Sequence, residues 1–277
     1  MPTPQLPQAL ARQTLFTRLA DDVPVLLAHP DEGWSDADAA PPSSRPTVIW
    51  MHGRTVNKEL DPGRYLRWMR AGIATCAIDL PGHGERFDAT YQAPDHTLMI
   101  VEQMASELDA VVDALDSPRF RGAFDTQNLA IGGMSAGGMV TLHRLTRPHP
   151  FRCAAVESTA GDFEAMRSTQ ESLNSPAHGF YVEERVRRLN PMAHMDEWRP
   201  VPLLALHSEK DEWVPVEAIR GFIDALRARY ATALGDPNEI EFVTWPETGA
   251  PAEHAGFGRV ANEAKIRQLE FLKTNLL

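Results

Sequence analysis

The feature that most constrains the fold of this sequence is a regular alternation of short apolar runs with longer amphipathic segments, which begins near residue 47. Short apolar runs bounded by proline, glycine or polar residues are typical of strands buried on both faces. These runs occupy residues 47–51, 73–80, 128–133, 153–158, 201–207 and 240–245. Because strands that alternate with helices usually pair in parallel, we expect a mainly parallel sheet covered by helices on both faces.

Amphipathic segments between these runs predict the helices. In the clearest of them, Ile100, Met104, Leu108 and Val111 form one apolar stripe at helical spacing. The predicted helices cover residues 63–72, 97–117, 136–147, 214–231 and 258–276. Residues 14–30 predict a β-hairpin instead, and the proline-rich first dozen residues predict irregular chain. The predicted fold is therefore α/β, with a doubly wound, mostly parallel eight-stranded sheet.

One segment interrupts the alternation. Residues 161–200 separate two consecutive strands, a distance too long for a plain connection, and they contain two short helical patterns. We expect residues 1–277 to form a single domain in which 161–200 is a small helical lid over the carboxyl edge of the sheet. The alternative is a decorated surface crossover without a role.

The composition argues against several classes of protein. The net charge of −11 disfavours a nucleic-acid partner, because binding phosphates requires basic residues. No apolar run approaches the roughly 20 residues that cross a bilayer, and residues 1–16 do not resemble a secretory signal. Cys76 and Cys153 lie in apolar runs, which favours buried free thiols. We therefore expect a cytoplasmic protein that binds neither membranes nor nucleic acid.

A glycine-rich turn contains the first candidate for chemistry. Residues 131–140 read IGGMSAGGMV, so that Gly133, Ser135 and Gly137 form a G-x-S-x-G motif between a predicted strand and a predicted helix. In that setting the serine occupies a strained turn, and its hydroxyl projects above the sheet edge near a helix N-terminus. Ser135 is therefore predicted to be a nucleophile, and the alternative is a structural Gly-Ser bend.

A serine nucleophile needs a base and an acid that orients the base. In this architecture both follow the serine, at the ends of later strands. Three carboxylates follow the strand at 201–207, namely Glu209, Asp211 and Glu212. His254, in the loop after the last strand, is the one histidine beyond Asp211 and is therefore the predicted base. His178 and His194 lie in the predicted lid and are candidates for the cleft wall, with an exposed surface position as the more common alternative.

The remaining part of such a site stabilises the negative oxygen that forms during attack on a carbonyl. Backbone N–H groups usually serve this purpose. We predict the N–H groups of Ala136, directly after the serine, and of Arg54, in the loop after the strand at 47–51. No histidine or cysteine spacing typical of a metal site is present.

Several motifs in order resemble the α/β-hydrolase fold. They read VIWMHG, AIDLPGHGER, GGMSAGG, ALHSEKDEWVP and EHAGFG, and the resemblance extends from about residue 14 to the end. The set is similar to bacterial esterases of the dienelactone-hydrolase and prolyl-oligopeptidase-like branch. The resemblance implies a triad of Ser135, Asp211 and His254, since the Asp-x-x-Val-Pro pattern favours Asp211 over its neighbours. It also implies an ester, thioester or amide substrate and no cofactor.

Two further residues are predicted to contact substrate. Arg54 stands where relatives often have a small or apolar residue, so its guanidinium is a candidate partner for an acidic acyl group. It could instead point outward or pair with Glu59 or Asp79. His83, in the PGHGER turn, is a second candidate contact, with scaffolding of the turn as its alternative.

The sequence thus predicts a serine hydrolase that acts on a small or medium carboxylic ester, with a homodimer as a possible assembly. A thioesterase or peptidase would use the same triad. A non-catalytic ligand-binding member of the fold is the rival from another class.

Overall fold

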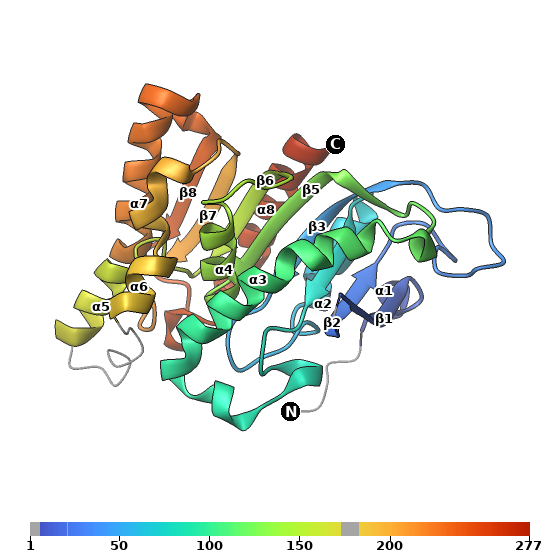
Figure 1. Cartoon of the computed structure of the whole chain (residues 1–277), viewed down its shortest axis with the longest axis horizontal. Coiled ribbons are helices and arrows are strands. Elements are labelled where there is room, and N and C mark those ends of the chain that lie inside the picture. Colours follow the sequence, from blue (N-terminus) through green and yellow to red (C-terminus); the bar gives the residue numbers. More distant parts are fainter. Residues whose placement is uncertain (1–5, 21, 173–182) are drawn as a thin grey trace.

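A computed structural model describes residues 6–20, 22–172 and 183–277 (Figure 1). Its centre is an eight-stranded sheet in the order β1-β2-β4-β3-β5-β6-β7-β8. The strands are β1 (Thr14–Leu19), β2 (Val23–Ala28), β3 (Arg45–Met51), β4 (Ala74–Ile78), β5 (Phe124–Met134), β6 (Phe151–Glu157), β7 (Leu203–Ser208) and β8 (Ile240–Trp245). Strands β1 and β2 form the predicted antiparallel hairpin, and β3 to β8 run parallel.

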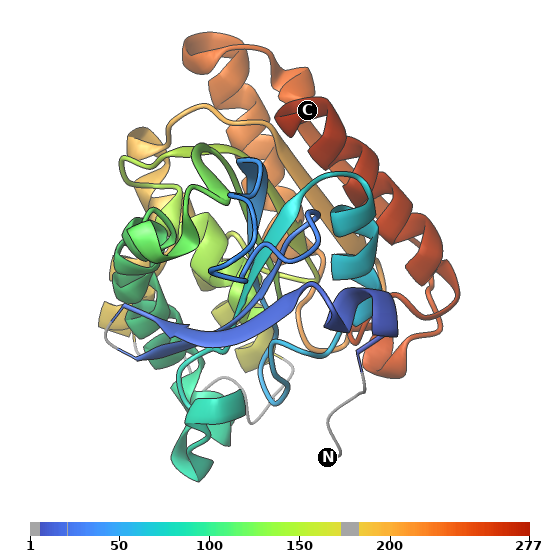
Figure 2. The same ribbon diagram turned by 90° about the vertical axis from the view of Figure 1, so that its right-hand side faces the viewer.

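Helices cover both faces of the sheet (Figure 2). The buried residues of α3, α4 and α7 belong to one core cluster, and those of α1, α2 and α8 belong to the other. These helices are α1 (Gln8–Ala11), α2 (Pro62–Arg70), α3 (Thr97–Leu115), α4 (Ala136–Arg144), α7 (Glu217–Arg229) and α8 (Ala261–Leu276). The predicted doubly wound α/β architecture is confirmed.

Alternation along each strand divides the core between the two faces. In β3, Ile49 and Met51 pack into the cluster under α3 and α4, whereas Val48 and Trp50 pack into the cluster under α2 and α8. Because side chains of a strand point alternately to opposite faces, a strand covered on both sides must be apolar at every position. This requirement explains why the strands read as continuous apolar runs.

The N-terminal segment differs from the prediction. Residues 8–11 form the short helix α1 where irregular chain was expected. Leu10 is fully buried in the cluster with α2 and α8, and the Thr14 hydroxyl donates to the Leu10 carbonyl at 2.8 Å. Burial of Leu10 in the core stabilises this turn. The prediction of irregular chain was based on the proline content of the segment, which gives no information about such a tertiary contact.

Within the predicted lid segment 161–200, the described residues form α5 (Phe163–Ser172) and α6 (Glu183–Leu189), followed by a 3₁₀ segment over residues 191–197. Phe163 and Met166 of α5 are buried in the core cluster that contains α7. Residues 173–182, including His178, lie outside the described residues. A lid function for this segment stays a prediction.

Among the described residues, none of the helices combines the length and apolar character that crossing a bilayer requires.

Candidate active site

The turn that carries Ser135 joins β5 to α4 at the carboxyl edge of the sheet. Ser135 has φ +53° and ψ −117°, a backbone conformation that side-chain-bearing residues rarely adopt. Its N–H donates to the carbonyl of Glu157 in β6 at 2.8 Å, and its carbonyl accepts from the Thr159 hydroxyl at 2.8 Å. The neighbouring strand therefore helps to hold the strained turn, and strain of this kind is typical of functional sites.

The glycines on either side of the serine are required by close backbone approach. A Cβ atom on Gly133 would lie 2.5 Å from the carbonyl carbon of Gly137, and one on Gly137 would lie 2.3 Å from the Met51 oxygen. Both distances are too short for any side chain, because the atoms met are backbone atoms that cannot move aside. The two glycines of the motif thus let β3, β5 and α4 converge beneath Ser135.

The predicted acid and base are in direct contact. His254 Nδ1 lies 2.8 Å from Asp211 Oδ2 and 3.0 Å from Oδ1, and both side chains are buried. Because an ionised carboxylate can only accept, Nδ1 carries the proton and Nε2 remains as the basic nitrogen. The chain separates these residues by 43 positions, and the ends of β7 and β8 bring them together.

Asp211 is held from several sides. Its Oδ1 accepts from the N–H groups of Trp213 at 2.9 Å and Val214 at 2.8 Å. His207 Nε2 lies 3.5 Å from Oδ2 and donates to the Val214 carbonyl at 2.8 Å. Burial lowers the pKa of His207, so this ring is neutral near pH 7.

The two competing carboxylates lie elsewhere. Glu209 accepts from the Thr244 hydroxyl at 2.8 Å on the exposed surface, whereas Glu212 is an exposed residue of the pocket wall. Of the three carboxylates, all of which lie in the described part of the chain, Asp211 is the one that hydrogen-bonds to His254.

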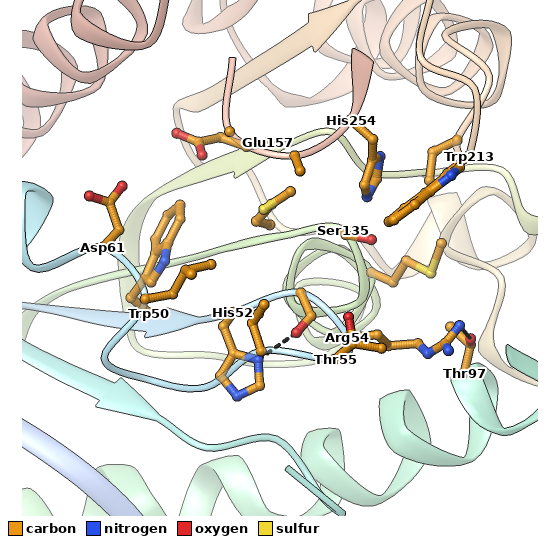
Figure 3. Close-up of a pocket in the computed structure, with 18 of the residues that line it drawn as sticks. Trp50, His52, Arg54, Thr55, Asp61, Thr97, Ser135, Glu157, Trp213 and His254 are labelled. Carbon is orange, nitrogen blue, oxygen red and sulfur yellow. Dashed lines mark hydrogen bonds between the residues drawn. The ribbon is translucent and has the colours of Figure 1, made fainter. Parts of the chain in front are cut away.

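Ser135 and His254 line the same cavity, which has a volume of about 700 Å³. In Figure 3 the Ser135 hydroxyl lies between the imidazole of His254 and the loop that contains His52 and Arg54. The Trp213 ring lies 4.9 Å from the His254 ring and is more than half exposed at the pocket. The cavity therefore gives a small molecule access to the serine.

The loop after β3 lies close to the serine. A Cβ atom on Gly53 would lie 3.3 Å from the Cβ of Ser135. His52 Nε2 accepts from the Leu80 N–H at 3.0 Å, so its Nδ1 carries the proton and donates to the Gly53 carbonyl at 2.5 Å. Since carbonyl and N–H of a trans peptide point in opposite directions, the Arg54 N–H points away from the His52 ring. Burial lowers the pKa of His52 to about 4, which keeps this arrangement neutral.

The other predicted oxyanion donor, Ala136, is the first residue of α4. N–H groups in the first turn of a helix have no acceptor within that helix, and the helix dipole adds a partial positive charge there. The Ala136 amide therefore suits an anionic oxygen next to Ser135.

The side chain of Arg54 lies along the pocket wall. Its Nη2 donates to the Gln92 carbonyl at 2.7 Å, and its Nη1 donates to the Thr97 hydroxyl at 3.2 Å. These partners differ from Glu59 and Asp79, the partners weighed from the sequence. Arg54 and Thr97 both line the cavity (Figure 3).

Two of the candidate residues, His83 and His194, lie away from the cavity. His83 is buried, its Nδ1 donates to the Pro81 carbonyl at 2.8 Å, and it is outside the set of residues that line the cavity. Its position favours the scaffolding alternative. His194 contacts Glu197 at 3.3 Å and the Arg188 carbonyl at 3.0 Å on the surface, and it too is outside the cavity wall.

Sequence reasoning did not anticipate a buried ion pair in the cavity wall. Arg64 in α2 donates to both carboxylate oxygens of Glu157 at 2.6 and 2.8 Å, and its guanidinium lies 4.3 Å from the Trp50 ring. Gln268 and Asp61 complete the network. The one signal available was Glu157 itself, a charged residue at the end of an otherwise apolar run.

No group of three or more histidine, cysteine, aspartate or glutamate side chains suited to a metal ion occurs in residues 6–20, 22–172 and 183–277.

Comparison with known families agrees with this geometry. The sequence pattern of the prolyl oligopeptidase family matches residues 64–276, well over half of the chain. The chain belongs to the prolyl oligopeptidase family. The predicted resemblance to α/β-hydrolases of this branch is thereby confirmed.

Two individual relatives match most of the length of this chain. Esterase YjfP of Escherichia coli strain K12 is 26% identical over 238 residues, which cover 81% of this chain and 86% of YjfP. Among solved structures, TT1662 of Thermus thermophilus superposes with a TM-score of 0.66 at 21% identity and covers 95% of this chain and 97% of its own.

A larger relative shares the same fold. A puromycin-hydrolyzing peptidase of Mycobacterium tuberculosis superposes with a TM-score of 0.68 at 19% identity. The match covers 99% of this chain but 42% of the peptidase. This protein thus spans less than half the length of that enzyme, whereas it spans most of YjfP.

Proposed function

We propose that this protein is a serine hydrolase that cleaves small or medium carboxylic esters through an acyl-enzyme intermediate. Ser135 is the nucleophile, His254 the general base and Asp211 the acid that orients it. The N–H groups of Arg54 and Ala136 bind the oxyanion. The observation that carries the proposal is the hydrogen bond of 2.8 Å between His254 and the buried Asp211, in the same cavity as a serine held at φ +53°.

The reaction follows from this arrangement. His254 Nε2 accepts the Ser135 proton as the serine oxygen attacks the ester carbonyl, and Asp211 offsets the charge of the imidazolium. The tetrahedral oxygen accepts from the amides of Arg54 and Ala136. The alcohol leaves with the proton from His254. Water, activated by the same imidazole, then cleaves the acyl-enzyme to release the carboxylic acid and restore the serine.

The esterase proposal draws on YjfP, which is named an esterase. The match covers 86% of YjfP, so the comparison extends over most of that protein. The names of two structural relatives favour a second candidate, because a puromycin-hydrolyzing peptidase and an acylaminoacyl peptidase share the fold. A peptidase or thioesterase would use the same triad, since the same attack on a carbonyl releases an amine or a thiol.

Arg54 is the residue we propose for choosing the acyl group. Its guanidinium lies along the cavity wall with Thr97 and is permanently charged. A carboxylate on the acyl group would gain a charge-assisted hydrogen bond there. Residues 161–200 are proposed to cover the cavity. Met166 is the one residue of that segment, among those described, that lines it. A cytoplasmic location and a homodimer remain predictions from the sequence.

The test is a series of p-nitrophenyl esters of increasing chain length, with matched thioester and anilide substrates. Wild type is expected to hydrolyse the esters with the highest kcat/KM, and Ser135→Ala is expected to lose at least about a thousandfold in kcat. A fluorophosphonate probe should label Ser135 alone. Full esterase activity in Ser135→Ala, or labelling at another residue, would contradict the proposal.

The Arg54 assignment is tested within the same series. Arg54→Ala retains the backbone N–H and is expected to lose activity on esters with an acyl carboxylate while retaining it on neutral esters. An unchanged ratio between the two ester classes would end the assignment.

A further inference from the structure

The residue directly before the proposed base makes an unusual set of contacts. The carboxylate of Glu253 accepts from the Thr248 N–H at 2.6 Å, the Gly249 N–H at 2.6 Å, the Thr248 hydroxyl at 2.8 Å and the Ser208 hydroxyl at 2.7 Å. Three of these four donors meet Oε2, and Gly249 meets Oε1. A carboxylate that accepts this many hydrogen bonds fixes the loop around it.

These contacts occur where the backbone is strained. Ala252 has φ +51° and Glu253 has φ +50°, so two consecutive residues with side chains occupy the left-handed region. Such residues persist where surrounding contacts hold them in place. Here the turn directs the next residue, His254, into the buried contact with Asp211. The hydrogen bonds of Glu253 oppose relaxation of this turn.

The same contacts connect the loop of the base to the loop of the acid. Ser208, which donates to Glu253, also accepts from the Asp211 N–H through its carbonyl at 3.3 Å. A second connection runs from the Glu212 N–H to the Ala252 carbonyl at 3.1 Å. A displacement of the Glu253 carboxylate would therefore change the position of His254 relative to Asp211.

We propose that Glu253 is a positioning residue that holds His254 against Asp211 in the catalytic arrangement. This inference rests on the proposed function, since it concerns the base of that reaction. Glu253 itself is outside the set of residues that line the cavity. It acts through the loop 248–254 and through Ser208.

The electrostatics of the contact support this role. Partial burial by itself raises the pKa of Glu253, but the hydrogen bonds from Thr248, Ser208 and Gly249 lower it to about 2. Glu253 is therefore ionised throughout the range in which an imidazole base works. The hydrogen bonds that the Glu253 carboxylate accepts therefore persist across that pH range.

Glu253→Gln is the informative variant, because glutamine has the same shape but one acceptor oxygen. Its NH₂ group must face either the Gly249 N–H or the three donors now on Oε2, so at least one donor loses its acceptor. We expect kcat for ester hydrolysis to fall about 10- to 100-fold with KM within about twofold of wild type. The pKa of His254, followed by NMR titration, should shift from its wild-type value.

The matched control is Glu247→Gln in the same loop. Glu247 is exposed and pairs with Lys210 at 2.8 Å, so its substitution makes the same charge change without touching the Glu253 contacts. We expect its kcat to stay within about twofold of wild type, since exposed ion pairs contribute little. Glu253→Asp, one methylene shorter, is expected to recover part of the lost activity by keeping the amide contacts.

Ser208→Ala provides a second route if Glu253→Gln does not fold. It removes one contact from the carboxylate, and its effect on kcat should not add to that of Glu253→Gln in the double variant. The inference is overturned if wild type is active and both Glu253→Gln and Ser208→Ala match Glu247→Gln in kcat and in the His254 titration. Inactivity of wild type on every ester would instead overturn the proposed function.

Discussion

The turn around the serine and the loops around its partners are held in place by different kinds of contact. The nucleophile turn, residues 132–138, is held by backbone atoms that approach closely at glycines, as at Gly133 and Gly137. The acid–base loops, residues 208–214 and 247–254, are held by polar side chains, above all Asp211 and Glu253. Figure 3 shows both parts meeting at one cavity.

The difference predicts how each part tolerates change. A Cβ added at these glycines would meet backbone atoms below van der Waals distance, so substitution of Gly133 or Gly137 should affect folding itself. A hydrogen-bonded loop can lose one partner and relax, so substitution of the side chains that hold the acid–base loops, Asp211 and Glu253, should affect rate and pH dependence while the fold persists.

The largest effect is expected at Gly137. In Gly137→Ala the added Cβ would meet the Met51 oxygen at 2.3 Å and the His52 oxygen at 2.7 Å. We expect the free energy of unfolding to fall by about 3 kcal/mol or more, measured by urea denaturation. Gly221→Ala in α7 is the control. A Cβ there meets nothing within 4 Å, and alanine favours a helix by up to about 1 kcal/mol. Equal free energies of unfolding for Gly137→Ala and Gly221→Ala would contradict the role assigned to close backbone approach in the nucleophile turn.

A large effect on rate with a small effect on stability is expected at Asp211. Asp211→Asn keeps an oxygen for the N–H groups of Trp213 and Val214 but weakens control over the tautomer of His254. We expect kcat to fall by roughly 10³- to 10⁴-fold, with the free energy of unfolding changed by about 1 kcal/mol. Glu209→Gln, the exposed neighbour, should retain the wild-type kcat. A greater loss in Glu209→Gln than in Asp211→Asn would assign the acid differently.

The smallest effect is a difference in pH dependence between the helix that follows the nucleophile turn and the acid–base loops. Burial lowers the pKa of His143, in the helix after Ser135, to about 4. The unfolded chain then takes up a proton first, so stability is lost as pH falls from about 6.5 toward 4. The pKa of Glu253 is lowered to about 2, so its contribution, present above about 4.5, is lost as pH falls toward 2.

Urea denaturation at several pH values tests this separation. His143→Gln should flatten the stability curve between about pH 6.5 and 4, and Glu253→Gln should flatten it between about pH 4.5 and 2. Identical curves for wild type and the two variants would show that neither group links proton uptake to unfolding.

Much of the fold followed from local pattern. The apolar runs and the stripe on α3 predicted the strands and helices, because a short continuous apolar run indicates a strand buried on both faces and a period of 3.6 residues indicates the helix face toward the core. Helix α1 was missed because its anchor, Leu10, is one residue whose partners lie in α2 and α8. The candidate nucleophile also followed from a local signal, since Gly133 and Gly137 mark the turn of Ser135, whereas the choice of Asp211 followed from the resemblance to α/β-hydrolases.

What the sequence by itself determined about this protein is the alternation of strands and helices and the identity of the three candidate residues. Each depends on the shape and polarity of neighbours along the chain. Only the tertiary structure decided which side chains meet, as in the Arg64–Glu157 pair across 93 positions and the contact of Glu253 with Ser208 across 45. The physical reason is that a change of a few tenths of an ångström in the donor–acceptor distance decides whether a hydrogen bond forms. Tertiary packing sets that distance, and the local sequence pattern does not encode it.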